Sequence, residues 1–391
     1  MTQSSYPFAA LMRVTPRPER VFVRGEGSWL FDHEGRRYLD FIQGWAVNCL
    51  GHSPRVVVQA LADQARELVN PSPAYFNAPA LALAQCITTS SGLDQVYFAN
   101  SGAEANEGAI KLARKWGQKH KDGAYEIITT ENSFHGRTLA TMSASGKKAF
   151  EPLFEPKVPG FIKVPYNDAA AVEAAITPRT VAVMLEPIQG EGGVIEARPE
   201  YLRQLAELAQ RHKLLLIFDE VQTGFGRTGQ MYGFQQAGVR PDIMTLGKSI
   251  GAGVPLAALV ASNDVCCFEF GDQGGTYGGN PLMTAVGLAV YRQLNAPGFF
   301  AEVNAVADYL TQALAGLSRE LGLGEVRGRG MLQALVIKPD TASKVASQAF
   351  DAGVLINAPR PDTLRLMPAL TVTRGEIDLL VERLRPILAA C

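Results

Sequence analysis

The feature that most constrains the fold is a series of short apolar runs that alternate with helical stretches along the middle of the chain. Each run has the length of a strand and carries few charges, as expected for strands buried on both faces. Helical patterns lie between several of them, for example over 103–116 and 199–211. This order predicts an α/β fold with a mostly parallel sheet. The predicted strands are Gln95–Ala99, Glu126–Thr130, Val181–Leu185, Leu214–Phe218, Ile243–Leu246 and Leu256–Val260.

The segments on either side of this region have different patterns. Two alternating stretches, Trp29–Asp32 and Arg37–Phe41, predict a hairpin near the N-terminus. From about Pro281 a helical stretch leads into Gly-rich turns, short strands and a C-terminal helix, which indicates a smaller α+β domain. The break at Asn70–Pro73 marks a boundary. We therefore predict a large domain over 71–280 and a small domain built from 1–70 and 281–391.

Composition excludes several classes of protein. The 391 residues include 37 Lys and Arg and 38 Asp and Glu, and the resulting net charge of -1 gives no electrostatic case for nucleic-acid binding. The apolar stretch Val254–Ala261 is far shorter than the ~18 residues of a membrane span, and Met1–Ala10 lacks the basic start of a signal peptide. The five cysteines form no CxxC pair and the five histidines no HxxxH pair. We expect a cytoplasmic protein with no membrane partner and no metal site.

Three matches to familiar motifs fail on their context. The glycines of Gly224–Gly229 fit GxGxxG but do not lie at a strand-to-helix turn. Gly247–Gly251 fits the GxSxG motif of hydrolases, but that fold requires a histidine after the serine. The last histidine of this chain is His212, which precedes the motif. A Walker A loop ending at the same place needs glycine at position 242, which is Asp242. What remains is Lys248 in a Gly-rich turn just past a strand, where α/β proteins bind ligands.

Three features converge on one chemistry. Asn100–Asn106 follows a strand and begins a helix whose free N–H groups suit an anion such as phosphate. Asp219 ends a strand, and a carboxylate beside a pyridine ring keeps the ring nitrogen protonated. Lys248 ends the next strand, where apolar neighbours favour a lowered pKa and a Schiff base. Each feature alone has an ordinary explanation: a plain helix start, an N-cap or ion pair, a solvated lysine. Together they are the parts of a pyridoxal phosphate site.

At these residues the sequence resembles the class III, or omega, aminotransferases of pyridoxal-phosphate fold type I, and among them the acetylornithine aminotransferases. The resemblance extends from about Val21 to Thr373. It implies a transaminase that moves the δ-amino group of N2-acetylornithine to 2-oxoglutarate, as in arginine biosynthesis. The motifs that carry the resemblance are Asn100–Asn106, Phe134–Thr138, Leu185–Gly193, Phe218–Gly224, Thr245–Lys248 and Gly275–Pro281.

The resemblance also implies roles around the cofactor, pyridoxal 5'-phosphate. Lys248 forms the Schiff base and moves the proton, and Asp219 pairs with the ring nitrogen. Phe134 stacks on the ring, and His135 has a structural or supporting role. Thr276 reaches the phosphate from a neighbouring subunit, so that a homodimer shares the site. The other implied contacts are Ser101, Gly102 and Ala103 at the phosphate, Gln222 at the ring 3'-oxygen, Val221, and Glu186, which supports Gln222 and the ring.

Two arginines and one glutamate carry the implied substrate choice. Arg137 binds the distal carboxylate of glutamate or the α-carboxylate of the omega-amine donor. Arg365 binds the α-carboxylate of glutamate, since a guanidinium fork matches a carboxylate. Glu191 pairs with Arg365 when that carboxylate is absent, which masks a charge that is costly to leave unpaired. Taken alone, each of the three is more commonly part of a surface ion pair.

Two positions depart from the relatives and leave the substrate open. Trp45 stands where ornithine δ-aminotransferases have a tyrosine at the substrate's α-amino end; a bulky apolar residue favours an acylated nitrogen, and core packing is the alternative. Gly275 stands where many relatives have a serine that contacts substrate. The rival donors are succinylornithine, succinyldiaminopimelate, ornithine and 4-aminobutyrate. An isomerase and a non-catalytic protein of the same fold are the rival classes.

Overall fold

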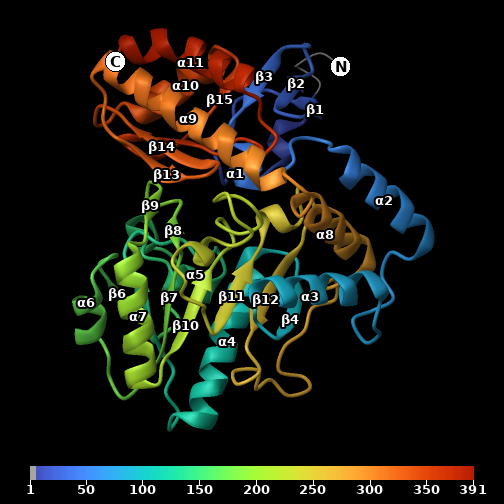
Figure 1. Cartoon of the computed structure of the whole chain (residues 1–391), viewed down its shortest axis with the longest axis vertical. Helices are drawn as coiled ribbons and strands as arrows, with labels where there is room; N and C mark the ends of the chain where they lie inside the picture. Colours follow the sequence, from blue (N-terminus) through green and yellow to red (C-terminus); the bar gives the residue numbers. More distant parts are fainter. Residues whose placement is uncertain (1–5) are drawn as a thin grey trace.

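A seven-stranded sheet forms the centre of the larger part of the molecule (Figure 1). The computed structural model describes residues 6–391, so the start of the predicted N-terminal segment, residues 1–5, lies outside the described residues. The strand order is β4-β12-β11-β10-β7-β5-β6, and only β12 runs antiparallel to its neighbours. The predicted mostly parallel α/β sheet is confirmed. Its strands are β4 Gln95–Ala99, β5 Glu126–Thr130, β6 Phe161–Val164, β7 Thr180–Leu185, β10 Leu215–Asp219, β11 Ile243–Leu246 and β12 Ala257–Ala261.

Both faces of this sheet are covered, which explains the continuous apolar runs. In β10, Leu215 and Ile217 belong to one buried cluster, together with residues of α4 (Gly102–His120). Leu216 and Phe218 point to the other face and join the main core with residues of α7 (Pro199–His212). A strand covered on both faces has no polar side to alternate with its apolar one.

The smaller part of the molecule combines the two ends of the chain (Figure 1). The predicted hairpin pairs β2 with β3, and β3 also pairs in parallel with β15 from the C-terminal region. A second sheet has the order β13-β14-β17-β16 and is antiparallel throughout. These strands are β1 Phe22–Glu26, β2 Trp29–Asp32, β3 Arg37–Asp40, β13 Val326–Arg329, β14 Leu332–Val336, β15 Val354–Leu355, β16 Asn357–Arg360 and β17 Thr363–Leu366. The two-stranded β8 (Ile188–Gln189) and β9 (Ile195–Glu196) form a separate pair.

The remaining helices connect and cover these sheets. Helix α8 packs against both α2 and α3, so it contacts elements from either side of the predicted boundary at 70, and the domain limits stay a prediction. Within residues 6–391, no helix is both long and apolar enough to cross a membrane. The bounds are α2 Arg55–Glu67, α3 Ala78–Ser91, α5 Leu139–Ala144, α6 Ala169–Ala174, α8 Pro281–Leu294, α9 Phe299–Leu321, α10 Ala342–Asp351 and α11 Arg374–Ala389.

The short α1 (Gln43–Ala46) is a left-handed turn. All four of its residues have φ between 49° and 65°, a conformation that costs a non-glycine residue about 1–2 kcal/mol. The buried Asp40 holds the turn, because its Oδ1 accepts hydrogen bonds from the backbone N–H groups of Ile42 (2.7 Å) and Gln43 (2.9 Å). The turn leaves the side chain of Trp45 49% exposed. No pattern in the sequence indicates this conformation.

A glycine near the end of α4 gives a stability prediction. A Cβ atom on Gly117 would overlap the carbonyl oxygen of Ala124, whereas a Cβ on Gly316 in α9 would meet nothing within 4 Å. We expect Gly117→Ala to cost about 1–3 kcal/mol through overpacking and Gly316→Ala to gain about 0.5–1 kcal/mol from helix propensity. Thermal unfolding should show shifts of opposite sign. Equal shifts in the two variants would contradict this packing of α4.

Candidate active site

The predicted site residues gather at the carboxyl edge of the central sheet. Asp219 is the last residue of β10, Lys248 begins the short η5 (Lys248–Ile250) two residues after β11, and Glu186 follows β7. Parallel strands end at the same edge, so these three side chains come together there although they are distant in sequence. Strand β4 ends at Ala99 on the same edge and places Ser101 beside them.

Asp219 is held by donors on both of its oxygens. Its Oδ2 accepts from Asn106 Nδ2 and from the ring Nδ1 of His135, each at 2.8 Å, and its Oδ1 accepts from the backbone N–H of Val221 at 3.0 Å. Thr245 Oγ1 donates to Asn106 Oδ1 at 2.7 Å and thereby orients that amide. Asp219 is only 3% exposed. The carboxylate is thus fixed in direction before any ligand binds.

Asn106 and Thr245 are parts of this network to which the sequence reading assigns no role. Asn106 lies on the buried face of α4 among alanines, and Thr245 lies in a buried strand. A polar side chain at a position where the helix pattern demands an apolar one is the signal that marks Asn106. His135 donates to Asp219 directly, so it lies next to the predicted cofactor ligands.

Lys248 is half-buried in the site, and its backbone has a φ of 47°. Burial lowers the pKa of its amine below the ordinary value, although Asp219 and Glu191 oppose that shift. The residue after it, Ser249, donates its hydroxyl to the Ala46 carbonyl at 3.2 Å, and its own carbonyl accepts from Cys49 Sγ. The lysine turn is therefore fastened to the left-handed segment of the N-terminal region.

The start of α4 approaches the lysine turn closely because Gly102 has no side chain. A Cβ there would lie 2.6 Å from Val221 Cγ1, and Gly247 packs against the same valine. Ser101 is the N-cap residue, and its hydroxyl accepts from the Glu104 N–H. The N-terminal N–H groups of a 19-residue helix thus lie beside Val221 and Gly247, and Ala103 is the second residue of that helix. This is the arrangement expected of a phosphate cradle.

Glu186 binds the backbone around the predicted ring position. Its Oε1 accepts from the Phe134 N–H at 2.9 Å and its Oε2 from the Gly190 N–H at 3.4 Å. Burial raises its pKa to about 7. Gln222 lies against Gly190, where a Cβ would overlap its Oε1, and it accepts from Arg365 Nη1 at 3.2 Å. Within residues 6–391 Glu186 makes no direct hydrogen bond to Gln222, so any support passes through the Gly190 backbone.

Arg365 and Glu191 form the predicted ion pair. Arg365, fully buried on β17, donates from Nη2 to Glu191 Oε1 at 2.6 Å. Its Nε donates to Asn357 Oδ1 at 2.9 Å, and its guanidinium lies 5.9 Å from the centre of the Trp45 ring. Trp45 therefore borders the site rather than the core. Arg365 comes from the β13-β14-β17-β16 sheet, and Glu191 comes from the turn between β8 and β9. The pair therefore joins the smaller part of the molecule to the larger part.

Arg137 lies nearby on an exposed position without a carboxylate partner in residues 6–391. Its guanidinium carbon is 5.9 Å from the Phe134 ring centre and 5.6 Å from that of Phe150. A second cation, Lys147, lies within 6.0 Å of both rings and 3.5 Å from Glu191 Oε2. No motif points to Lys147.

Thr276 and Gly275 lie on the exposed loop between β12 and α8, and no hydrogen bond or ion pair within residues 6–391 joins them to the site residues described above. Thr276 contributes its carbonyl to a hydrogen bond from Asn70 Nδ2 at 3.4 Å, and a Cβ at Gly275 would touch the Tyr97 hydroxyl. Their predicted role at the site of a neighbouring subunit stays a prediction.

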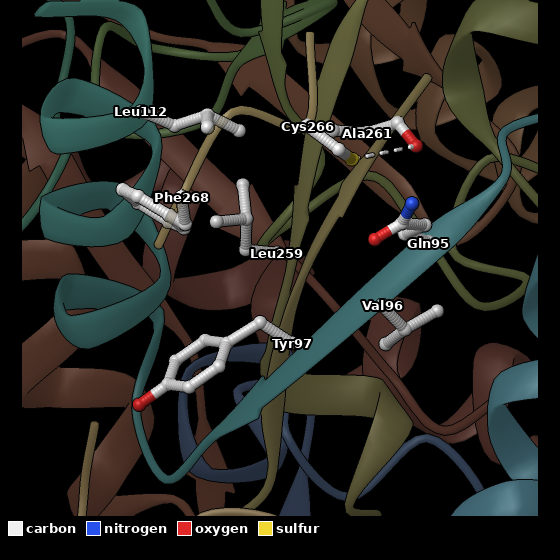
Figure 2. A pocket seen from close by; sticks show the side chains of 8 residues that line it. All are labelled: Gln95, Val96, Tyr97, Leu112, Leu259, Ala261, Cys266 and Phe268. Atoms are coloured by element: carbon white, nitrogen blue, oxygen red, sulfur yellow. Dashed lines mark hydrogen bonds between the residues drawn. The ribbon is translucent and has the colours of Figure 1, made fainter. Parts of the chain in front are cut away.

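A small cavity elsewhere in the molecule does not belong to the site. Figure 2 shows this cavity of about 110 Å³ between α4, the edge strand β4 and β12. Its lining is mostly apolar and contains none of the predicted site residues. The lining residues are Gln95, Val96, Tyr97, Leu112, Leu259, Ala261, Cys266 and Phe268.

Comparison with known proteins decides the family. The model of the family "Aminotransferase class-III" matches residues 12–388. The chain is a class III aminotransferase. A curated relative, the acetylornithine aminotransferase of Ralstonia nicotianae, is 57% identical over 397 residues and covers 100% of both chains. The solved ornithine aminotransferase of Toxoplasma gondii is 32% identical, with a TM-score of 0.93 and coverage of 100% of this chain and 96% of that one. The N-acetylornithine aminotransferase of Stenotrophomonas maltophilia is 36% identical, with a TM-score of 0.84 and 96% coverage of both.

As a class III aminotransferase, the protein is a pyridoxal-phosphate-dependent transaminase. The site fits that cofactor on three observations. The space that a Cβ would fill at Gly102 is closed by Val221, so the helix start is a tight cradle. The Asp219 carboxylate is fixed by its donors, and Lys248 has a lowered pKa. When bound, the cofactor supplies an aldehyde and an electron-withdrawing ring.

Proposed function

We propose that this aminotransferase transfers the δ-amino group of N2-acetylornithine to 2-oxoglutarate, giving N-acetylglutamate semialdehyde and glutamate, in arginine biosynthesis. The observation that carries the proposal is the closed Glu191–Arg365 pair. The reacting δ-carbon of such a donor bears no carboxylate that could pair with Arg365. The arginine must then be paired with Glu191, because an unpaired buried guanidinium would be costly. The acetylornithine aminotransferase that shares 57% of its residues over the full length supports the choice of donor.

The residues divide the work between the cofactor and its ligands. Lys248 Nζ would hold the cofactor through its aldehyde, and the same amine would move the proton of the donor's amino-bearing carbon. Asp219 would keep the ring nitrogen protonated, and Gln222 would hold the ring 3'-oxygen. Phe134 and Val221 would hold the ring, and Glu186 fixes the Phe134 backbone. Ser101, Gly102 and Ala103 would hold the phosphate.

The amino donor and 2-oxoglutarate both bind Arg137 and differ in whether they bind Arg365. Arg137 binds the α-carboxylate of the donor and, in the second half of the reaction, the distal carboxylate of 2-oxoglutarate. The α-carboxylate of 2-oxoglutarate then takes Arg365 from Glu191. Trp45 presents an apolar ring where ornithine would place an ammonium group, which favours an acylated nitrogen. Gly275, at the site of the neighbouring subunit, would offer the substrate no hydroxyl.

We also propose a cytoplasmic homodimer whose two sites are shared. Thr276 is exposed on the loop between β12 and α8, and no hydrogen bond within residues 6–391 joins its side chain to Ser101, Gly102 or Ala103, so it is free to serve a second copy. Size measurement in solution tests the assembly, and a monomer with full activity would contradict it.

The visible spectrum of the cofactor tests the donor. N-acetylornithine added without a keto acid should remove the visible absorption band of the enzyme-bound cofactor. Adding 2-oxoglutarate should then restore that band. Ornithine, which carries the extra ammonium, should remove the band at least about tenfold more slowly. Succinylornithine and 4-aminobutyrate belong in the same series. An unchanged band with N-acetylornithine would contradict the proposal, and turnover without any keto acid would indicate an isomerase.

A further inference from the structure

Lys147 is held in place by its backbone at the mouth of the site. The preceding Gly146 lies against the strand end, since a Cβ there would overlap the Thr130 carbonyl oxygen. Gly146 donates its N–H to Ser133 Oγ at 3.0 Å and accepts from the Asn132 N–H at 3.0 Å. On the other side, the Lys147 carbonyl accepts from the Phe150 N–H at 2.8 Å. The lysine therefore projects from a fixed point.

The Glu191 carboxylate has one cation on each oxygen. Oε1 accepts from Arg365 at 2.6 Å and Oε2 lies 3.5 Å from Lys147 Nζ. The side chains of Arg365, Glu191 and Lys147 are 0%, 23% and 35% exposed. Burial alone would raise the pKa of Glu191, but Arg365 and Lys147 outweigh it and hold that pKa below its ordinary value. The glutamate thus stays ionised between a buried arginine and a lysine near solvent.

We infer that Lys147 is the second ion-pair partner of Glu191. When a carboxylate of a dicarboxylate substrate binds Arg365, the Glu191 side chain pairs with Lys147 instead. This inference rests on the proposed function of the same site. Opening the pair would otherwise leave a mostly buried carboxylate without an ion-pair partner, which is strongly unfavourable. A lysine on a flexible stem suits this task, since its ammonium can follow the carboxylate while it stays partly hydrated.

The inference makes Lys147 a positioning residue for one half of the reaction only. With N-acetylornithine the pair stays closed, so Lys147 adds little. With 2-oxoglutarate or glutamate the pair opens, so the second partner lowers the cost of binding. Its loss therefore changes the ratio between the two half-reactions rather than the fold.

The test compares Lys147→Gln with a matched control one residue away. Lys148 is exposed, and its side chain makes no hydrogen bond or ion pair within residues 6–391. Lys148→Gln therefore removes the same charge from the same segment without breaking a contact. Two quantities are measured on the holoenzyme: the single-turnover rate with each substrate, and the calorimetric Kd of glutarate, an unreactive dicarboxylate. We expect Lys147→Gln to weaken glutarate and slow the 2-oxoglutarate half-reaction about tenfold each, against a change below about twofold with N-acetylornithine. Lys147→Arg should recover most of the loss, and Lys148→Gln should show none.

A double-mutant cycle with Glu191→Gln identifies the partner. If Lys147 acts through Glu191, Lys147→Gln should have less than about twofold effect in the Glu191→Gln background. Equal losses in both half-reactions that persist in that background would overturn the inference, since they indicate direct binding of the distal carboxylate. Unchanged glutarate affinity in Lys147→Gln would overturn it as well. A wild-type enzyme that bound glutarate but ignored N-acetylornithine would instead contradict the proposed donor.

Discussion

Lys248→Ala is expected to lower kcat by at least about 1,000-fold. The substitution removes both the amine that binds the cofactor aldehyde and the base that moves the proton, and proton transfer alone contributes about 10²–10⁴-fold. Among residues 6–391, Lys248 is the one lysine that faces Asp219, Glu186 and Glu191 together. Burial lowers the pKa of its amine, and these three carboxylates partly offset that shift. Steady-state assay with N-acetylornithine and 2-oxoglutarate gives the number.

The control for this variant is a lysine away from the site. Lys344 is exposed on α10, and Lys344→Ala should keep the wild-type rate. Cofactor retention is measured in parallel, because the phosphate cradle at Ser101–Ala103 does not depend on the lysine amine. Wild-type turnover in Lys248→Ala would show that the chemistry lies elsewhere.

Asp219→Ala is expected to lower kcat by at least about 100-fold, in line with the loss of one fixed electrostatic group. Without the carboxylate the ring nitrogen loses its proton partner, so the ring withdraws electrons less strongly. The variant should also lose stability, because one N–H of the Asn106 amide and the ring N–H of His135 would lose their acceptor in a buried site, at about 1–3 kcal/mol each.

Asp242→Ala separates these two effects. Asp242 accepts from the Leu216 N–H at 2.7 Å at the opposite edge of the same sheet. It should therefore cost stability and leave kcat near the wild-type value. Thermal unfolding and steady-state rates are measured for both variants. An Asp219→Ala enzyme that lost only as much activity as Asp242→Ala would contradict the role given to Asp219.

The central sheet could be predicted because its strands are short and apolar and are separated by amphipathic helices. Strand β6 (Phe161–Val164) could not, since an edge strand is covered less completely and includes Lys163, whose amine donates to the Ser143 carbonyl at 2.9 Å. The left-handed turn Gln43–Ala46 was also beyond prediction, since three of its four residues are not glycine and the contact that starts it, from Asp40 to the N–H groups of Ile42 and Gln43, leaves no local pattern.

The chemistry of the site was more predictable than its recognition of substrate. Asp219 ends β10 and Lys248 closely follows the adjacent parallel strand β11, and that topology alone brings them together. Arg365, Glu191 and Lys147 come from three separate segments with no local pattern that links them. The resemblance implied the pairing of Arg365 with Glu191, but only the folded chain brings Lys147 to the second oxygen.

The hydrogen bonds of Ser249 have a consequence for how this enzyme can be redesigned. Because Ser249 is bonded to the Ala46 carbonyl and to Cys49 Sγ, a residue inserted beside Lys248 would break those bonds or move the lysine amine away from Asp219. The lysine segment therefore tolerates little change in length. Trp45, Lys147 and Glu191 lie outside the central sheet, so a change of side chain at these positions leaves its strands as they are. A search for new amino donors should diversify those three positions and their neighbours, and leave the lysine segment untouched.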